Sequence, residues 1–164
     1  MKSVLILYDT QFGNTKQVSL EIAASILTHE GFTAKVERGD NLDIENISGY
    51  DAILFGGPTR AFRATRGALN TIKRAAKSGL DEKIVACFGC YMMGDQSRGV
   101  KAMDKLVDKV APNAFHIKPG FSAKVDGVRG PVNERVSSDI PRFAKSIIDE
   151  VVHRDMKTAQ VNTA

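Results

Sequence analysis

Apolar runs and segments of helical periodicity alternate along the whole chain. The runs that begin near Val4, Asp51 and Lys83 show no alternation of polar and apolar residues. Such runs are typical of strands that are buried on both faces of a sheet. Two less regular segments complete the set, and Pro119-Gly120 interrupts the second of them. The predicted strands are residues 4–8, 32–37, 51–55, 83–88 and 114–123.

Between these strands, apolar residues recur at spacings of three and four, which predicts helices with one buried face. Gly31 and Gly79 follow the first two helices, as is usual where a helix ends, and Pro112 breaks the third. Residues 41–50 are expected to form a loop with one helical turn. The predicted helices are residues 14–30, 64–78, 100–110 and 136–151.

The order of these elements predicts the fold class. Strands that alternate with helices need crossover connections, which produce an α/β fold: a parallel sheet with helices on both faces. Ligands bind such sheets at the carboxyl ends of the strands, so the loops after the first, third and fourth strands should share one rim. Apolar periodicity fades near the end, so we expect one domain over residues 1–154 and a frayed tail over residues 155–164.

Composition narrows the class of protein without naming a function. Apolar residues make up 43% and charged residues 26%, as in an ordinary globular protein. The net charge of +4 is mild and the basic residues are scattered, so we expect no nucleic-acid binding. We also expect no membrane span, because no apolar segment is long enough. Two cysteines give no disulfide framework, which favours a cytoplasmic protein.

The loop after the first strand carries the strongest chemical signal. It combines hydroxyl and amide side chains with a glycine, directly before a predicted helix begins. The first N–H groups of a helix lack partners within the helix, and the dipole favours an anion there. The pattern predicts a phosphate-binding loop, although an ordinary helix-capping turn uses similar residues. The candidate phosphate-binding residues are Thr10, Gln11, Phe12, Gly13, Asn14 and Thr15.

The same loop carries a resemblance to a known family. The chain has neither a G-K-[ST] triphosphate loop nor the dinucleotide fingerprint G-x-G-x-x-G, which leaves a monophosphate as the expected ligand. Residues 4–23 resemble the FMN-phosphate loop of flavodoxins, [ST]-x-[ST]-G-x-[ST], which Thr10, Gly13 and Thr15 match. Phe12 stands where a hydroxyl is usual. An aromatic residue there is similar to the flavodoxin-like domain of A-type (di-iron) flavoproteins.

This resemblance extends over nearly the whole chain and implies a fold and a cofactor. The expected fold is a flavodoxin-like three-layer sandwich whose five-stranded parallel sheet has the order 2-1-3-4-5. The expected cofactor is FMN. By the same resemblance, the loop after the third strand would lie against the flavin ring, with candidate residues Pro58, Thr59, Arg60, Ala61 and Phe62.

Two features of this second loop leave alternatives open. Phe62 would give the ring a flat apolar wall, or it would simply belong to the core. Arg60, Arg63 and Arg66 lead into a helix start, where the dipole disfavours cations. They would face an anion outside the protein surface, or they would form a solvated basic face. The segment 59–66 contains no glycine, so a backbone flip there would have to strain another residue.

The loop after the fourth strand completes the expected flavin site. Tyr91 would form the second wall of a flavin sandwich, or it would only cover the sheet edge. The candidate residues are Gly89, Cys90, Tyr91, Met92, Gly94 and Asp95. Cys87 and Cys90 form a C-x-x-C pattern, but a redox dithiol is not expected because Cys87 falls inside a buried strand. No metal site is expected either, since the histidines are scattered at positions 29, 116 and 153.

These expectations combine into a flavoprotein that shuttles electrons between cytoplasmic redox partners. No side chain is expected to act as a catalytic acid, base or nucleophile, because the flavin holds the electrons. The positive charge of Arg60, Arg63 and Arg66 beside the flavin ring favours acidic, ferredoxin-like partners. A di-iron partner is also possible, because three histidines cannot supply the iron site of A-type flavoproteins. The alternative is an FMN-dependent NAD(P)H:quinone oxidoreductase, in which the arginines receive an anionic substrate.

Overall fold

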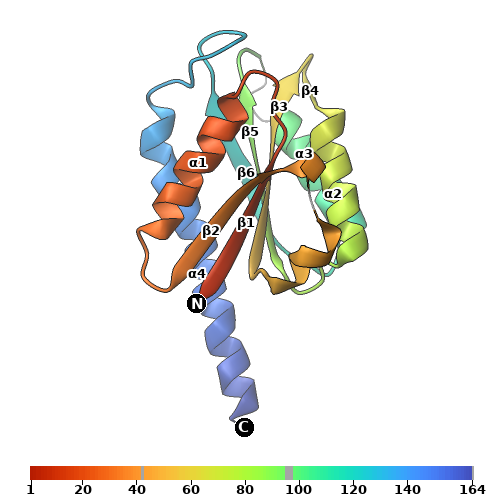
Figure 1. Cartoon of the computed structure of the whole chain (residues 1–164), viewed down its shortest axis with the longest axis vertical. Helices are drawn as coiled ribbons and strands as arrows, with labels where there is room; N and C mark the ends of the chain where they lie inside the picture. The colour runs from red at the N-terminus through yellow and green to blue at the C-terminus, as the bar shows by residue number, and fades with distance from the viewer. Residues whose placement is uncertain (42, 95–97, 164) are drawn as a thin grey trace.

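A parallel sheet lies between two pairs of helices in the computed structural model (Figure 1). The structure describes the chain except residues 42, 95–97 and 164, and except the side chains of residues 44–46. The sheet runs in the order β2-β1-β3-β5-β6, and all of these neighbours pair in parallel. This arrangement confirms the predicted flavodoxin-like α/β fold and its strand order.

The strands of the sheet lie close to the predicted positions. They are β1 (Lys2–Tyr8), β2 (Phe32–Arg38), β3 (Ala52–Arg60), β5 (Ile84–Tyr91) and β6 (Phe115–Lys124). A short strand, β4 (Arg63–Ala64), pairs antiparallel with the end of β3. The two 3-10 helices Gly39–Asn41 and Ile44–Gly49 connect β2 to β3.

The helices cover both faces of the sheet and create two separate cores. Helices α1 (Asn14–Leu27) and α4 (Val136–Asn162) cover one face, whereas α2 (Arg66–Ser78) and α3 (Arg98–Val110) cover the other (Figure 1). Successive residues of a strand point to opposite faces. Val4 and Ile6 therefore pack in the α1/α4 core, while Leu5 and Leu7 pack in the α2/α3 core. Burial on both faces explains why the strands read as unbroken apolar runs.

The third strand is longer than the sequence indicated. We expected it to end at Phe55, because Gly56-Gly57-Pro58 is typical of a chain break. That boundary is wrong, since β3 stays paired with β5 as far as Pro58 opposite Cys90. Gly56 belongs in the strand because the ring of Phe88 occupies the place where a side chain would lie. The extra residues extend β3 at the carboxyl end of the sheet, where it pairs with the end of β5.

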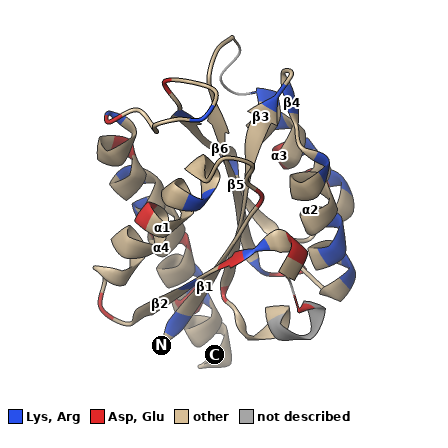
Figure 2. Ribbon diagram, turned by 45° about the horizontal axis from the view of Figure 1, so that its top comes forward, with Lys and Arg blue, Asp and Glu red and all other residues tan. Residues whose placement is uncertain are grey.

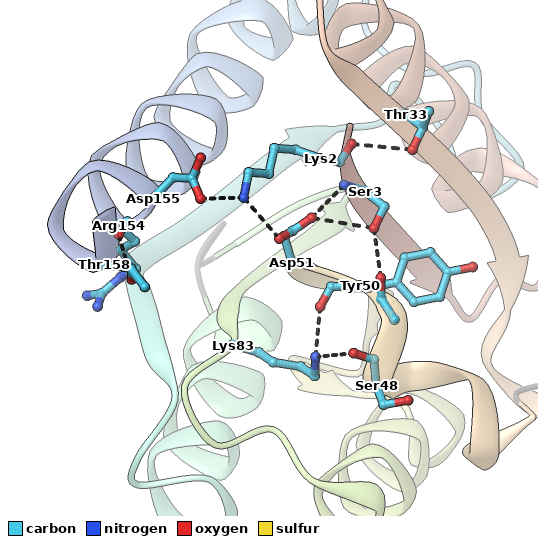
Figure 3. Close-up of polar contacts among 11 residues, drawn as sticks. Lys2, Ser3, Thr33, Ser48, Tyr50, Asp51, Lys83, Arg154, Asp155 and Thr158 are labelled. Carbon is cyan, nitrogen blue, oxygen red and sulfur yellow. Dashed lines mark hydrogen bonds and ion pairs between the residues drawn. The ribbon is translucent and has the colours of Figure 1, made fainter. Parts of the chain in front are cut away.

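The last helix is also longer than expected. The frayed tail predicted for residues 155–164 is wrong over most of its length, because α4 continues to Asn162. The residues after Asp155 include no glycine or proline that would end a helix. Asp155 also receives a 2.6 Å hydrogen bond from the Nζ of Lys2, which fixes α4 to the first strand (Figure 3). No helix in the described part of the chain is both long enough and apolar enough to cross a membrane.

Further polar contacts hold the sheet together at the amino ends of its strands. Asp51 accepts a 2.8 Å hydrogen bond from the backbone N–H of Ser3 (Figure 3). Lys83 donates from its Nζ to the carbonyl oxygens of Ser48 and Tyr50 at 3.0 and 2.8 Å. Partial burial lowers the pKa of Lys83. These contacts stabilise the end of the sheet that lies opposite the carboxyl ends of the strands.

Candidate functional site

A cavity of about 220 Å³ opens at the carboxyl ends of β1, β3 and β5. Four segments of the chain surround it: the loop after β1, the end of β3 with its turn, the end of β5, and the loop after β6. Of the described residues that line it, Arg60 alone carries a charge. The lining residues are Thr10, Gln11, Phe12, Asn14, Thr15, Pro58, Thr59, Arg60, Ala61, Cys90, Tyr91, Met92, Val125, Gly127 and Val128.

The first loop brings the N-terminus of α1 to this cavity. Gly13 precedes the helix with a φ of 88°, a left-handed conformation that costs glycine little. Its N–H donates to the Oγ1 of Thr10 at 3.0 Å, which closes the loop. No side chain caps α1, and its first turn contains no acidic residue. The helix therefore presents free N–H groups and the positive end of its dipole to the cavity.

Helix α2 starts at the same edge of the sheet but is capped differently. The Oγ1 of Thr65 accepts a 3.3 Å hydrogen bond from the N–H of Ala68. The same hydroxyl donates to the carboxylate of Asp9, at the end of β1. The chain passes the Asp9 carboxylate so closely at Gly67 that a side chain there would collide with it. The protein thus supplies its own anion to α2, whereas the first turn of α1 contains no acidic residue.

Thr15 supplies a second sign of a missing partner at α1. Its side chain is 0% exposed, and its Oγ1 has no hydrogen-bond partner among the described residues by ordinary distance and angle criteria. The nearby Cys90 thiol is a weak partner: burial raises the pKa of Cys90 to about 11, and Thr15 opposes this slightly. A buried hydroxyl without a proper partner is costly. An anion at the N-terminus of α1 would supply the acceptor that this hydroxyl lacks.

The second loop forms a tight hairpin instead of an open loop. Arg60 of β3 lies directly opposite Arg63 of β4, which leaves Ala61 and Phe62 as a two-residue turn. Their φ values of 47° and 62° are both positive, as a type I′ turn requires. Neither residue is glycine, so the turn stores backbone strain beside the cavity. Arg60 and Arg63 thus belong to this hairpin, whereas Arg66 is the first residue of α2.

Phe62 lies outside the cavity and does not belong to the core. Its side chain is 57% exposed, and its ring packs against Gly94. The guanidinium of Arg98 lies 5.7 Å from the centre of this ring. The core alternative for Phe62 is therefore wrong, and the structure places the ring on the outer rim. Ala61 takes the position beside the cavity.

The loop after β6 was missed in the sequence analysis. Val125, Gly127 and Val128 from this loop complete the lining of the cavity. The loop is closed by a bridge between Val125 and Val132, and it passes close enough to Asn14 that a side chain at Gly130 would collide with it. Two signals in the sequence could have predicted this part of the site: the glycines of the loop, and its position after a parallel strand.

Most of the predicted site residues surround the cavity, but four do not line it: Gly13, Phe62, Gly89 and Gly94. Gly13 shapes the first loop, and Gly89 packs against the backbone of Gly57 and the side chain of Val100. Asp95 lies outside the described residues. The binding roles of all these residues stay predictions. Twelve of them lie together around the cavity: Thr10, Gln11, Phe12, Asn14, Thr15, Pro58, Thr59, Arg60, Ala61, Cys90, Tyr91 and Met92.

The two cysteines are free and buried. Burial is the main cause that raises the pKa of Cys87, and the neighbouring Asp104 raises it further. A redox dithiol needs a thiolate that is stabilised near neutral pH. Both thiols have the opposite shift, in agreement with the view that C-x-x-C is coincidental here.

Comparison with known proteins gives the family. Residues 5–124 match the family described as the flavodoxin domain. This chain belongs to the flavodoxin domain family. The match runs from within β1 to the end of β6, so it includes three of the four segments around the cavity and stops before the loop after β6. No curated protein matches the chain.

Solved structures share the fold of this flavodoxin domain. A flavodoxin from the domain Archaea superposes with a TM-score of 0.78 at 16% identity, over 92% of this chain and 99% of that one. Rubredoxin oxygen:oxidoreductase from Desulfovibrio gigas gives 0.74 at 20%, over 92% of this chain. The flavodiiron protein from Giardia intestinalis gives 0.76 at 14%, over 96% of this chain. The chain spans only 36% and 38% of the latter two proteins.

Proposed function

We propose that this flavodoxin domain binds FMN and carries electrons between redox proteins of the cytoplasm. The observation that carries the proposal is the uncapped N-terminus of α1 beside the unpartnered hydroxyl of Thr15. A phosphate monoester there would accept hydrogen bonds from the first N–H groups of α1 and from Thr15. Family membership and the likeness to an archaeal flavodoxin support the same cofactor.

The lining residues suit the rest of the FMN molecule. Thr10 and Asn14 line the cavity and would flank the phosphate, while apolar side chains such as Val125 and Val128 also line it. Tyr91 and Met92 lie at the end of β5, and Ala61 lies in the hairpin turn. These residues would hold the flavin ring and exclude water from it. Bound FMN supplies the redox chemistry by accepting and releasing electrons.

The surface around the cavity suits a partner with negative charge. Phe12, Phe62, Met93 and Val128 are exposed to at least 40% and form an apolar rim. Arg129 lies over the ring of Phe12 at 5.7 Å. Basic residues extend from the β3–β4 hairpin along α2 (Figure 2), beginning with Arg60, Arg63 and Arg66. Apolar side chains surrounded by positive charge would dock an acidic surface. We infer a ferredoxin-like acidic protein or a di-iron protein as the electron partner.

A direct test of the proposal is the colour of the purified full-length chain. The expected result is a yellow protein with an FMN spectrum, which binds FMN far more tightly than riboflavin. Riboflavin lacks the phosphate and is the matched control ligand. A colourless protein that binds neither compound would refute the proposal.

The second candidate function is an FMN-dependent NAD(P)H:quinone oxidoreductase. It is favoured by Arg60, an exposed cation in the lining of an open cavity, which would attract an anionic substrate. The two functions differ in turnover. Steady-state oxidation of NAD(P)H with a quinone acceptor would establish the enzyme. Electron exchange with redox proteins, without turnover of NAD(P)H and quinone, would establish the carrier.

A further inference from the structure

A cluster of charged and sulfur side chains lies on the α3 face of the sheet, apart from the cavity. Its members are Cys87 of β5, Asp104 of α3 and His116 of β6. One ligand atom from each of these residues lies within 4.8 Å of those from the other two. None of the three lines the flavin cavity.

An irregularity between β5 and β6 brings these groups together. Ala86 pairs with Ile117 and Phe88 with Phe121, so Cys87 alone faces residues 118–120. Such a bulge frees backbone groups and redirects side chains. The freed N–H of Gly120 donates to the Oδ2 of Asp104 at 3.0 Å, which holds this buried carboxylate beside the thiol.

His116 is held from both sides of its ring. Its Nε2 lies 2.9 Å from the Oδ1 of Asp104, and its Nδ1 lies 2.8 Å from the Oδ1 of Asp108. Lys118 in turn donates to the Oδ2 of Asp108 at 2.8 Å. A histidine that binds a metal through one nitrogen commonly donates the other N–H to a carboxylate, which fixes the ring and raises its basicity.

We propose that this cluster is a binding site for a divalent metal ion of the zinc class. The ligands are Cys87 Sγ, Asp104 Oδ1 and His116 Nε2, with a fourth position left for water. Asp108 and Lys118 act as positioning residues, because they orient the imidazole without touching the metal. Thiolate and imidazole ligands select zinc and related ions over magnesium and calcium, which prefer oxygen alone.

The pair of His116 and Asp104 needs only a small rearrangement to accept the ion. Tetrahedral zinc with bonds of about 2.0–2.1 Å to nitrogen and oxygen separates these two ligands by roughly 3.3 Å. The present 2.9 Å between His116 Nε2 and Asp104 Oδ1 must therefore open by a few tenths of an ångström. The side chain of Asp108 is 45% exposed, so the ion would enter from that side.

The electric charge of the cluster balances with and without the ion. Burial lowers the pKa of His116, but the hydrogen bonds to Asp104 and Asp108 outweigh it and raise the pKa overall, which favours the doubly protonated ring in the absence of the ion. Burial raises the pKa of Cys87 and favours its neutral thiol. Binding of Zn²⁺ releases the Nε2 proton of His116 and the thiol proton of Cys87 to solvent. Two protons thus leave for one divalent ion, and the net charge of the cluster stays the same.

The test uses the full chain as purified, stripped with a chelator and then dialysed against micromolar Zn²⁺. The expected result is one tightly held zinc per chain, lost in Cys87→Ala and retained in Cys90→Ala. Cys90 is the matched control because it is the other buried free thiol. The absence of stoichiometric zinc in the unsubstituted chain, or equal zinc in both variants, would overturn the proposal.

Two further measurements keep the test decisive if Cys87→Ala does not fold. Zinc-edge X-ray absorption of the unsubstituted protein should report one sulfur ligand, and a shell of nitrogen and oxygen alone would overturn the site. Asp108→Asn should weaken zinc binding about 10- to 100-fold while sulfur remains in the ligand shell. Asp149→Asn is its control, because Asp149 also accepts from a lysine, at 2.6 Å, but on the surface of α4. Equal zinc affinity in these two variants would contradict the role assigned to Asp108.

Discussion

Replacement of Thr15 by valine separates a binding role of its hydroxyl from a structural one. Thr15 Oγ1 is fully buried and has no ordinary hydrogen-bond partner among the described residues. Valine keeps the shape of the side chain and removes only the hydroxyl. The variant should therefore affect the stability of the free protein and its affinity for FMN in opposite directions.

The magnitudes follow from the two environments of the hydroxyl. Without ligand, an unsatisfied buried polar group costs about 1–3 kcal/mol, so Thr15→Val should raise the free energy of unfolding of the FMN-free protein. With ligand, a hydrogen bond to a charged group contributes about 1.5–3 kcal/mol, and its loss should weaken FMN binding roughly 10- to 150-fold. A hydroxyl with a purely structural role would not combine these two effects.

The assays are urea unfolding of the FMN-free protein and fluorescence titration with FMN and with riboflavin. Riboflavin affinity should stay unchanged in Thr15→Val, because the phosphate is absent. Ser19→Ala is the matched control: Ser19 is also buried in α1, but its hydroxyl donates to the Thr15 carbonyl at 2.7 Å. This control should lose stability and keep its FMN affinity. A Thr15→Val variant that is less stable and binds FMN normally would refute the reasoning.

Three further predictions concern the rim and the buried thiol. Ala61→Gly should raise the free energy of unfolding by about 0.5–1 kcal/mol in chemical denaturation, because the φ of 47° favours glycine; a loss of stability would contradict the strained turn. Arg60→Gln should lower the midpoint potential of bound FMN, because positive charge stabilises the reduced anion. An effect of about 1 kcal/mol corresponds to roughly 20 mV for two electrons. Potentiometric titration would measure it, with Lys157→Gln at the far end of α4 as the control, and equal potentials would remove Arg60 from the site. The pKa of Cys90 is raised from 9.0 to about 11, so the folded protein keeps a proton that the unfolded chain releases. Stability should therefore fall between pH 9 and 11 relative to Cys90→Ala, by at most about 1.4 kcal/mol per pH unit, and parallel pH profiles of the two proteins would refute this.

The sequence predicted a parallel sheet covered by helices on both faces, because strands that are buried on both faces leave a clear pattern. Val4 to Tyr8 and the corresponding runs contain few polar residues, and they alternate with amphipathic helices. The order of the strands came from the resemblance to flavodoxins, because this alternation fits more than one order. The end of β3 was harder to predict, because Gly56-Gly57-Pro58 has the local chemistry of a turn. Pairing with β5 and the space needed by Phe88 decide that segment, and neither is visible in a local window.

The site was predicted where the residues are close in sequence and missed where only the fold brings them together. Thr10 to Thr15 form one continuous loop, so their chemistry could be recognised together. Val125 to Val128 carry no distinctive side chains, and only their position after β6 places them beside that loop. Cys87, Asp104 and His116 belong to three different elements, and their proximity depends on a bulge between β5 and β6. Pro119-Gly120 marked the interruption of the strand in the sequence, but it did not indicate which side chains the bulge brings together.

The carboxylate of Asp9 at the start of α2 has a consequence for the choice among nucleotides. Asp9 and Thr10 are neighbours in the chain, yet one serves α2 and the other the loop before α1. The proposed FMN would place its single phosphate at α1, whose first turn contains no acidic residue. The second phosphate of a dinucleotide such as FAD, directed toward α2, would meet a carboxylate that already occupies the positive end of that helix. We therefore expect the protein to discriminate by repulsion as well as by attraction, and to admit one phosphate where two helices begin.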